Sequence, residues 1–398
     1  MKPVIKVFSE IGKLKTILVH RPSWEIENLT PELLKELLFD DIPFLKIAAK
    51  EHKYFTNLLE KEGVEVLYIE KLAAETFEIL PKNMKNKFID IFLKEGNVNE
   101  KYKDKLKKYF LSLSSTKLIE NMIAGIKKNK FEDNDKNSHN PFILNPLPNL
   151  LFQRDPLTTI ANGVTVNHMW SITRNRETIF SDLVFKHHPR FKNKVTFYYE
   201  RNNKHCLEGG DILILNKETL IIGITQRTEK ESINKLIKNL NANKNNTYKR
   251  IIILDVPKNR SFMHLDTIFT NIDYDKFLVH PFIFDDINKF KIYEITANSK
   301  KAIKKDLISY LSEIMKKPIK FIKCGDGDEI DAKREQWNDG TNVLTIRPGV
   351  VIAYNRNYVT NKILRENGIT VLEIPSSELS RGRGGPRCMS MPLYREDL

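Results

Sequence analysis

The amino-acid sequence predicts an α/β fold of up to five similar strand–strand–helix–strand (ββαβ) units, arranged as a five-fold pseudo-symmetric propeller or barrel with a helical insertion. Two observations underlie this prediction. β-rich runs occur in pairs around polar turns, and a helical pattern and a further strand follow them. Units of this kind cannot bury their apolar faces alone, so similar copies are expected to pack around a common centre.

The units follow one another along the chain, and dipeptides that favour turns mark two of their hairpins. Asn162-Gly163 and Pro348-Gly349 each lie between two β-rich runs. The predicted segments are, in order, a strand at 16–20, a helix at 48–61 and a strand at 64–69; a hairpin at 158–169, a helix at 177–186 and a strand at 195–199; a hairpin at 211–225, a helix at 233–240 and a strand at 251–256; a hairpin at 267–284, a helix at 304–315 and a strand at 319–322; and a hairpin at 343–354, a helix at 359–366 and a strand at 370–374.

Residues 73–145 interrupt this rhythm. They are rich in lysine, lack the alternation of a strand, and place apolar residues such as Phe88, Phe92 and Phe110 at helical spacing. We therefore predict a helical insertion over 73–145, between the first and second units. The α/β propeller, which would carry the functional site, then comprises residues 1–72 and 146–398.

The composition is that of a globular protein, since 41% of the 398 residues are hydrophobic and 10% are aromatic. The N-terminal sequence MKPVIKVFSEIGKLK has no apolar segment of the kind found in signal peptides, and no apolar run reaches transmembrane length. Three cysteines, Cys206, Cys324 and Cys388, are too few for a disulfide framework, and their number is odd. These features predict a cytoplasmic protein with no membrane association.

A formal net charge of +14 raises the question of nucleic-acid binding. The short lysine runs, such as 101–108 and 300–305, are interleaved with Asp, Glu and Asn, which is typical of solvated faces. No zinc-finger, helix-turn-helix or RNA-recognition signature accompanies them. Residues 381–385 (RGRGG) resemble one copy of an RNA-binding repeat, but a single copy followed by a cysteine is a weak signal. We therefore expect no specific nucleic-acid partner.

Acidic residues and a histidine recur just before the predicted hairpins. Asp155 precedes the second unit and Glu208 the third, while His264 and Asp266 precede the fourth. The segment 339–342 (DGTN) precedes the last unit. Units arranged about a centre would bring these positions together, so distant carboxylates and a histidine are expected to line one pocket.

Cys388 ends a glycine-rich segment, residues 381–388 (RGRGGPRC). A thiolate is the best side-chain nucleophile near neutral pH, but the thiol needs help to ionise. A cationic substrate beside the sulfur would supply that help, and the planar N–H groups of a guanidinium match several carboxylates. A histidine such as His264 would relay protons. The residues therefore predict a cysteine hydrolase that acts on a guanidinium, with the glycine-rich segment as a mobile gate.

Each of these residue types also has an ordinary structural explanation. Cys206 and Cys324 are expected to be packing residues, and a lone histidine is more often part of a core or a surface. His264 and Asp266 would project to the same side of a strand and form half of a metal site. No further His or Cys follows at zinc spacing, so we expect no metal and no other cofactor. Ser390 lacks a G-x-S-x-G setting, which argues against a serine hydrolase.

Together these segments resemble the arginine deiminases, a family of guanidine-modifying enzymes. The resemblance rests on 9–22 (SEIGKLKTILVHRP), 154–156 (RDP), 208–211 (EGGD), 264–266 (HLD) and 387–392 (RCMSMP), and it covers essentially the whole chain. It implies hydrolysis of free L-arginine to L-citrulline and ammonia through a covalent thiouronium on the cysteine. It also implies a homodimer or a larger homo-oligomer. The family usually has a threonine where this chain has Gln153, a departure that bears on local geometry.

The resemblance implies a role for each of five catalytic residues. Cys388 would attack the guanidinium carbon, while Asp155 and Asp266 would hold the guanidinium nitrogens. Glu208 would brace the substrate and the histidine. His264 would protonate the departing ammonia and then activate the water that cleaves the thiouronium.

Five more positions match the family around the other end of the substrate. They are Asn149, Phe152, Arg174, Arg227 and Arg383. Arg174 and Arg227 would pair with the α-carboxylate, and Arg383 matches a mobile gate arginine of some members.

Other functions stay open on the sequence alone. Agmatine, a methylated arginine or peptidyl arginine would be alternative substrates, although Arg174 and Arg227 favour a free α-carboxylate, which agmatine lacks. A basic binding protein, or a paralogue with a broken site, is the alternative outside catalysis. The complete set of catalytic residues argues against a broken site.

Overall fold

The computed structural model describes residues 3–131, 140–258, 262–281, 291–297 and 299–398. Within these ranges no helix combines the length and the apolar character needed to cross a membrane. The fold is a mixed α/β arrangement of several small sheets, as expected from the sequence.

Five sheets share one strand pattern, which is the predicted ββαβ pattern. In each, two strands pair antiparallel, and a third strand lies parallel to the middle one after an intervening helix. The sheets are β19 (Ser390–Arg395), β1 (Leu14–Val19) and β2 (Glu65–Tyr68); β5 (Leu157–Ile160), β6 (Gly163–Val166) and β7 (Thr196–Tyr199); β8 (Ile212–Asn216), β9 (Thr219–Ile224) and β10 (Arg250–Asp255); β11 (Phe269–Asn271), β12 (Lys276–Val279) and β15 (Lys320–Lys323); and β16 (Leu344–Arg347), β17 (Val350–Tyr354) and β18 (Thr370–Ile374).

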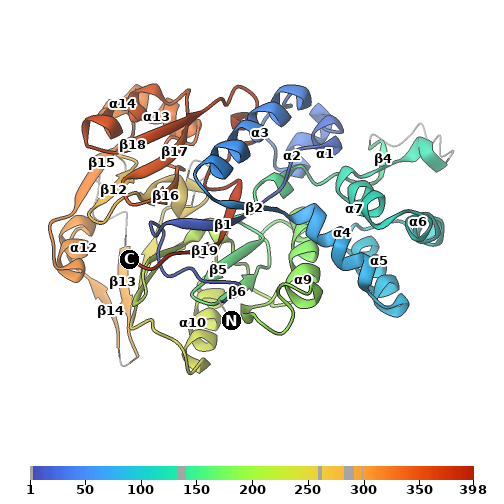
Figure 1. The fold of residues 1–398 in the computed structure, drawn as a ribbon, viewed down its shortest axis with the longest axis horizontal. Coiled ribbons are helices and arrows are strands. Elements are labelled where there is room, and N and C mark those ends of the chain that lie inside the picture. The colour runs from blue at the N-terminus through green and yellow to red at the C-terminus, as the bar shows by residue number, and fades with distance from the viewer. Residues whose placement is uncertain (1–2, 132–139, 259–261, 282–290, 298) are drawn as a thin grey trace.

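Helices surround these strands. The helices that precede the third strands are α3 (Leu45–Lys61), α9 (Glu177–His187), α10 (Lys230–Ala242), α12 (Leu307–Met315) and α14 (Tyr358–Glu366). Shorter helices are α1 (Trp24–Glu27), α2 (Leu34–Leu37), α8 (Ile172–Asn175) and α13 (Glu329–Trp337). In Figure 1 the strands occupy the middle of the molecule and the helices of the first group lie around them.

Burial explains why these segments form their elements. Strand β9 (TLIIGI) is buried along almost its whole length, as expected for a strand covered on both faces. Helix α10 buries Ile233, Leu236 and Leu240 along one face and exposes its lysines on the other. The Pro348-Gly349 turn is confirmed, because Gly349 has φ 72°, the left-handed conformation that a type II turn requires there.

The two ends of the described chain complete the first sheet. Strand β19 pairs antiparallel with β1, with Ser390 opposite Val19 and Arg395 opposite Leu14. The sequence predicts β1, α3 and β2 but no strand at 390–395, where Pro392 interrupts the pattern. β19 is an edge strand, the place in a sheet where a proline costs least, because a missing N–H can face away from the ladder.

The predicted Asn162-Gly163 turn lies one residue earlier in the structure. Ile160 pairs with Gly163, so Ala161 and Asn162 form the turn. Ala161 adopts φ 53°, and its backbone exchanges hydrogen bonds of 2.7 and 2.8 Å with the backbone of Val7. The N-terminal segment thus holds the turn in a register that the local sequence does not specify.

The fourth hairpin is present as β11 and β12, although the end of the predicted range, 282–284, falls outside the described residues. The sequence also does not predict β13 (Lys291–Ile295), β14 (Lys300–Ile303) and α13, nor the short helices α1, α2 and α8. Strands β13 and β14 extend the third sheet beyond β10. Strand β14 reads KKAI, and its lysines hide the apolar alternation of a strand.

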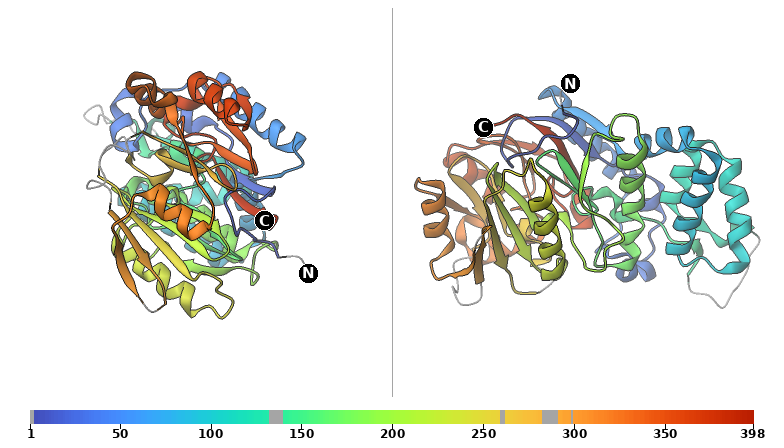
Figure 2. Two further views of the ribbon diagram at one scale, coloured as in Figure 1. Left: turned by 90° about the vertical axis from the view of Figure 1, so that its left-hand side faces the viewer. Right: turned by 90° about the horizontal axis from the view of Figure 1, so that it is seen from below.

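The described part of the range 73–145 is mainly helical. Its helices are α4 (Ile69–Ile79), α5 (Lys82–Glu95), α6 (Glu100–Ser112) and α7 (Ser115–Ala124), followed by the short strands β3 (Ile126–Lys127) and β4 (Phe142–Leu144). These helices lie to one side of the strands (Figures 1 and 2). Helix α4 runs through the expected boundary at 72, because no helix breaker occurs before Pro81. The division into a propeller and an insertion stays a prediction.

We predict that Leu393→Ala destabilises the fold by about 2–5 kcal/mol, because Leu393 is fully buried where β19 joins β1. Urea unfolding followed by circular dichroism measures this change. The control is Leu398→Ala, which removes the same atoms from a side chain that is 55% exposed and should change stability by no more than about 0.5 kcal/mol. Equal stability of the two variants would contradict a structural role for this joint.

Candidate active site

The segments just before the first strand of each sheet meet in one place. Hydrogen bonds link each segment to the next, so that the five segments form a ring. The donors and acceptors are Arg154 N to Cys388 O (3.1 Å), Gly209 N to Asp155 O (3.2 Å), Leu265 N to Asp211 Oδ1 (2.8 Å), Asn342 Nδ2 to Asp266 O (3.3 Å) and Cys388 N to Asn342 Oδ1 (2.9 Å). The ring gathers the acids, the histidine and the cysteine that are far apart in sequence.

A cavity of about 180 Å³ opens at this ring, which is room for one small molecule. Of the ten residues predicted for the site, those that line it are Asn149, Phe152, Asp155, Arg174, Arg227, His264, Arg383 and Cys388. Glu208 and Asp266 lie behind this lining, in contact with His264 and Cys388 respectively.

Cys388 presents a buried thiol to the cavity. Its backbone N–H donates to Asn342 Oδ1, and its Sγ lies 3.7 Å from Asp266 Oδ2. Burial raises the pKa of this thiol well above its usual range, and the charges of Asp266 and Asp155 raise it further. A positive charge beside the sulfur is therefore needed before the thiolate can form.

Asp155 and Asp266 are each half-satisfied. Oδ2 of Asp155 accepts a hydrogen bond from Arg174 (3.0 Å), and Oδ2 of Asp266 accepts one from Arg387 (2.6 Å). The Oδ1 atom of each is buried and accepts no hydrogen bond from the described part of the chain. An unsatisfied buried carboxylate oxygen is costly, so the pair favours a ligand rich in N–H donors.

His264 is held between two acids. Its Nε2 lies 2.8 Å from Glu208 Oε2, and its Nδ1 lies 3.8 Å from Asp155 Oδ1. Burial alone would lower the pKa of His264, but Asp155 and the hydrogen bond to Glu208 outweigh burial and raise this pKa to about 9. Gly210 is required beneath the ring, because a Cβ there would lie 2.7 Å from His264 Cγ. The site therefore holds an imidazolium at neutral pH.

The two arginines predicted to bind a carboxylate differ in their surroundings. Arg174 is already bound to Asp155 and, through two nitrogens, to Glu177. Arg227 stacks on Trp170, with Cζ 4.9 Å from the ring centroid, and its Nη1 lies 3.6 Å from a Glu208 oxygen. Nε and Nη1 of Arg227 are buried and have no hydrogen-bond partner among the described residues. Arg227 is therefore the better placed of the two to bind an anionic group.

The glycine-rich segment packs tightly against the cavity wall. A Cβ on Gly384 would overlap the ring of Phe152, and one on Gly385 would lie 2.5 Å from Asn342 O. Both glycines have ordinary backbone conformations. Arg383, which lies between Gly382 and Gly384, adopts φ 59°. Close packing thus explains these glycines in the structure, and their proposed role in a mobile gate stays a prediction.

Arg383 lies over the ring of Trp337, with Cζ 3.5 Å from the centroid, and lines the cavity. Asn149 donates its side-chain N–H to the carbonyl of Leu37. Gln153, where the family resemblance leads us to expect a threonine, is fully buried, donates to Leu150 O (2.7 Å) and does not line the cavity.

The sequence reasoning missed a buried ion-pair chain behind the sulfur. Arg387 contacts Asp266 on one side and Glu10 on the other, at 2.6 and 3.2 Å. Burial opposes ionisation of Glu10, yet Arg387 and Arg154 lower the pKa of this carboxyl to about 2. Arg387 directly precedes Cys388, but no local pattern signals its pairing with a residue at the other end of the sequence.

One ligand atom each from Asp155, Glu208 and His264 lie within 4.8 Å of one another, as the donors of a metal site would. His264 and Glu208 are already hydrogen-bonded to each other, and the guanidiniums of Arg174 and Arg227 lie within 4.0 Å of Asp155 and Glu208, respectively. These positive charges disfavour a metal cation. The absence of a metal stays a prediction.

The family model described as "Arginine deiminase" matches residues 35–395 of this chain. Curated relatives agree with that match. The arginine deiminase of Mycoplasma capricolum subsp. capricolum is 58% identical over 399 residues, covering 100% of this chain and 99% of the relative. The arginine deiminase of Clostridium perfringens is 51% identical over 411 residues, covering 99% and 98%.

More distant solved structures share the fold. An amidinotransferase from Microseira wollei has a TM-score of 0.58 at 15% identity and covers 99% of this chain and 98% of its own. A dimethylarginine dimethylaminohydrolase has a TM-score of 0.51 at 15% identity, with coverage of 95% and 99%. At such identities the likeness concerns the α/β fold alone.

We predict that Glu208→Gln lowers the pKa of His264 from about 9 toward its ordinary value, because the substitution removes a charged hydrogen-bond partner. NMR titration of the histidine ring shifts measures this pKa. His20, bound to Glu25 and Glu70 instead, is the internal control and should keep a pKa of about 10. Because folding raises this pKa, protonation of His264 also stabilises the fold. This contribution to stability is fully present below pH about 6.5 and is lost as pH rises through about 9. An unchanged His264 titration in the variant would contradict the role of Glu208.

Proposed function

Because this chain belongs to the arginine deiminase family, we propose that it hydrolyses free L-arginine to L-citrulline and ammonia. One observation in the site carries this proposal. A buried thiol lies beside two carboxylates, Asp155 and Asp266, and each of these keeps one oxygen to which no described residue donates. A guanidinium supplies both the missing N–H donors and the positive charge.

The substrate guanidinium would lie between Asp155 and Asp266, with its carbon over the sulfur of Cys388. Its N–H groups would donate to Oδ1 of each aspartate, while the Oδ2 atoms stay bound to Arg174 and Arg387. Its charge would offset the acids that raise the pKa of the thiol, so the proton leaves for solvent as the substrate binds. Binding and activation of the nucleophile are thus one event.

The first chemical step would replace a C–N bond with a C–S bond. The thiolate of Cys388 adds to the guanidinium carbon, and the terminal amino group leaves with a proton from His264. The donor is Nδ1, because Nε2 of the imidazolium is bound to Glu208. The products are ammonia, a neutral imidazole and a positively charged thiouronium on the sulfur.

The second step would return the enzyme to its starting state. Neutral His264 removes a proton from water, and the resulting hydroxide adds to the thiouronium carbon. The C–S bond then breaks to give citrulline and the thiolate of Cys388. The imidazolium is restored, and the proton released from the carbonyl product is taken up by ammonia. The thiolate regains a proton from solvent as citrulline leaves.

Arg227 would bind the α-carboxylate of arginine. Its buried Nε and Nη1 have no hydrogen-bond partner within the described ranges, and Trp170 holds its guanidinium plane. Arg174, with its nitrogens committed to acids, would instead position Asp155 and add positive charge nearby. This arrangement favours a free amino acid over agmatine. Asn149 and Phe152 would line the aliphatic part of the substrate, and Arg383 would cover it.

We further propose that the five ββαβ sheets close into a pseudo-five-fold propeller. The ring of hydrogen bonds between the pre-strand segments supports this arrangement. Residues 73–145 would form an insertion on this unit, and the chain would act as a homodimer or a larger homo-oligomer. A cytoplasmic location is consistent with three cysteines that form no disulfide.

Cys388→Ser should lower citrulline production from arginine to background, because a serine hydroxyl in this acidic surrounding does not ionise. A colorimetric citrulline assay on the purified protein measures the loss. Cys206→Ser is the matched control, since Cys206 lies outside the cavity, and it should retain near-normal activity. Turnover by the Cys388 variant would exclude this residue as the nucleophile.

Arg227→Ala should lower kcat/KM for arginine at least about tenfold through loss of a charge-assisted hydrogen bond. The same variant should change kcat/KM for agmatine far less, because agmatine has no α-carboxylate. Parallel steady-state assays with both substrates test this difference. Equal losses on the two substrates would show that Arg227 does not recognise the carboxylate.

A further inference from the structure

Asp155 and Asp266 each end a buried chain of three charged groups, in which an arginine joins the aspartate to a glutamate. In the first chain, Nη1 of Arg174 donates to Asp155 Oδ2 (3.0 Å), while its Nε and Nη2 donate to the carboxylate of Glu177 at 3.0 to 3.2 Å. We call these three residues the Glu177 chain. Glu177 itself does not line the substrate cavity.

The second chain repeats this pattern with residues that are far apart in sequence. Nη1 of Arg387 donates to Asp266 Oδ2 (2.6 Å), while its Nε and Nη2 donate to Glu10 at 3.3 and 3.2 Å. We call these three residues the Glu10 chain. Arg387 and Asp266 are at most 1% exposed, and Glu10 is 6% exposed. The same geometry thus holds both aspartates that are proposed to bind the guanidinium, and the reaction described above uses neither glutamate.

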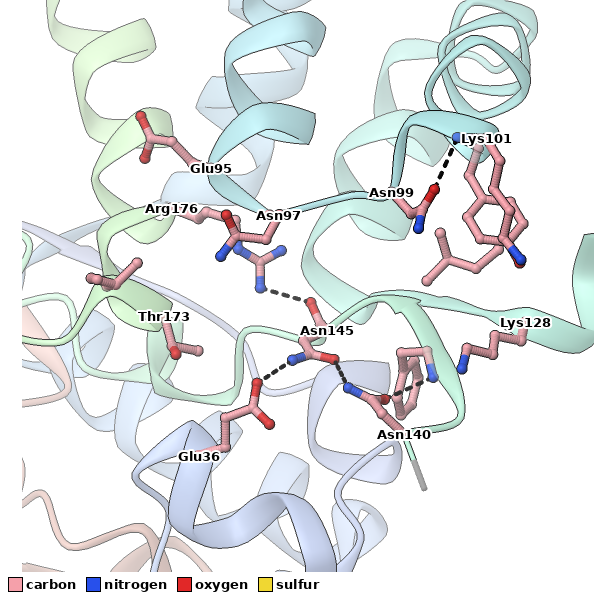
Figure 3. Close-up of a pocket in the computed structure, with 15 residues that line it drawn as sticks. Glu36, Glu95, Asn97, Asn99, Lys101, Lys128, Asn140, Asn145, Thr173 and Arg176 are labelled. Atoms are coloured by element: carbon pink, nitrogen blue, oxygen red, sulfur yellow. Dashed lines mark hydrogen bonds between the residues drawn. The ribbon is translucent and has the colours of Figure 1, made fainter. Parts of the chain in front are cut away.

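Burial of an arginine does not by itself require such a glutamate. Within the described ranges, three other buried arginines donate to backbone carbonyl groups and have no carboxylate at ion-pair distance; they are Arg154, Arg176 and Arg395. Figure 3 shows one of these bonds, from Nη2 of Arg176 to a backbone carbonyl (3.0 Å). Burial lowers the pKa values of these three arginines to about 9 or 10. Burial would lower those of Arg174 and Arg387 too, but their acids outweigh burial and raise them.

The glutamate of each chain resolves a conflict of charge. An arginine fixes the orientation of its aspartate, but alone it would also offset the negative charge that attracts a guanidinium. A glutamate offsets the arginine instead, so each chain carries one net negative charge when its acids are ionised. Burial opposes ionisation of Glu10, yet Arg387 and Arg154 lower the pKa of this carboxyl to about 2. Burial raises the pKa of Glu177 to about 7, so the Glu10 chain is the one that keeps its full charge at neutral pH.

We propose that Glu10 is a positioning residue for the deimination inferred above, and this proposal rests on that function. Glu10 holds Arg387 so that Arg387 directs Asp266 toward the substrate guanidinium without cancelling the charge of Asp266. Strand β8 supports both partners rigidly, because Ile214 N donates to Glu10 Oε1 (3.2 Å) and Ile212 O accepts from Arg387 Nη2 (3.0 Å).

The carboxylate of Glu10 also acts on the sulfur of Cys388 through Arg387. Besides burial, four charged groups shift the pKa of this thiol: three carboxylates raise it and one guanidinium lowers it. They are Asp266, Asp155, Asp339 and Arg387. Because Glu10 offsets the charge of Arg387, it helps to keep the thiol protonated until a substrate cation arrives.

Steady-state kinetics of Glu10→Gln test the positioning role. The substitution keeps the size of the side chain and removes its charge, so KM for arginine should rise about tenfold and kcat should fall. The matched control is Glu294→Gln, because Glu294 is 5% exposed and bound to Arg250 (2.7 Å) but does not line the cavity. This control should keep both constants near their wild-type values. A purely structural role of Glu10 would lower the apparent kcat through loss of active protein and leave KM unchanged, and that result would overturn the proposal.

Alkylation of Cys388 by iodoacetamide in the absence of arginine tests the effect on the thiol. Mass spectrometry of the peptide that contains Cys388 gives the rate at each pH. In Glu10→Gln the rate profile should move to lower pH by at least about one unit. Glu177→Gln should move the profile far less, because its partner Arg174 is not among the four charged groups named above. Equal shifts in the two variants would reveal a generally loosened site and exclude a specific role for Glu10.

Glu10→Asp keeps the proposal testable if Glu10→Gln does not fold. This variant retains the charge on a side chain one carbon shorter, so the alkylation profile should stay near that of the wild type while KM rises several-fold. A wild-type KM in Glu10→Asp would contradict the proposal. Failure of the wild-type protein to produce citrulline would instead defeat the proposed function, whereas the alkylation profile needs no turnover and decides the role of Glu10 separately.

Discussion

Carboxylates buried around a single sulfur are tolerable only because guanidinium groups neutralise them. Arg174 pairs with Asp155 and Arg387 pairs with Asp266, yet each aspartate keeps one oxygen without a donor in the described part of the chain. The protein has thus compensated most of the negative charge around Cys388 and left the remainder for a ligand. That remainder favours a cation that is flat and rich in N–H groups. It also keeps the thiol protonated until such a cation arrives.

The fold serves this electrostatic arrangement by repeating one position. Each sheet contributes the residues just before its first strand, and their backbones and side chains hydrogen-bond to the next segment in the ring. Strands hold these short segments rigidly at one end, so polar groups are placed on firm supports. The close packing of the His264 ring against Gly210 is one result, because a side chain at position 210 would displace the ring.

Much of this organisation is readable in the sequence because it is local. Paired β-rich runs, turn dipeptides and amphipathic helices predict the ββαβ units, and residues before the hairpins point to a shared pocket. What the sequence does not predict depends on distant contacts. Pro392 hides the strand β19, which exists because β1 offers it a partner. The chain from Glu10 through Arg387 to Asp266 joins residues with no common local pattern.

The chemistry of the pocket is likewise predictable from the sequence only in part. The types of catalytic residue follow from reaction chemistry together with the family resemblance, whereas the state of each group requires coordinates. The two predicted carboxylate-binding arginines look equivalent in sequence, but Arg174 donates hydrogen bonds to two acids, whereas Arg227 lies 3.6 Å from Glu208 and its Nε and Nη1 donate to no described residue. The glycines near Cys388 likewise suggest mobility in sequence, while Gly384 is required by the close approach of Phe152.

The pairing of β19 with β1 has a consequence for how the protein is made. Ribosomes deliver β1 first and β19 last of the described strands, and domains generally fold as units. One edge of strand β1 therefore stays unpaired until Ser390–Arg395 emerges and pairs with it. Contacts between such distant segments form slowly, because closing a long loop costs entropy. Since Cys388 enters the ring with that last strand, the nascent chain carries no assembled nucleophile until Ser390–Arg395 has paired with β1.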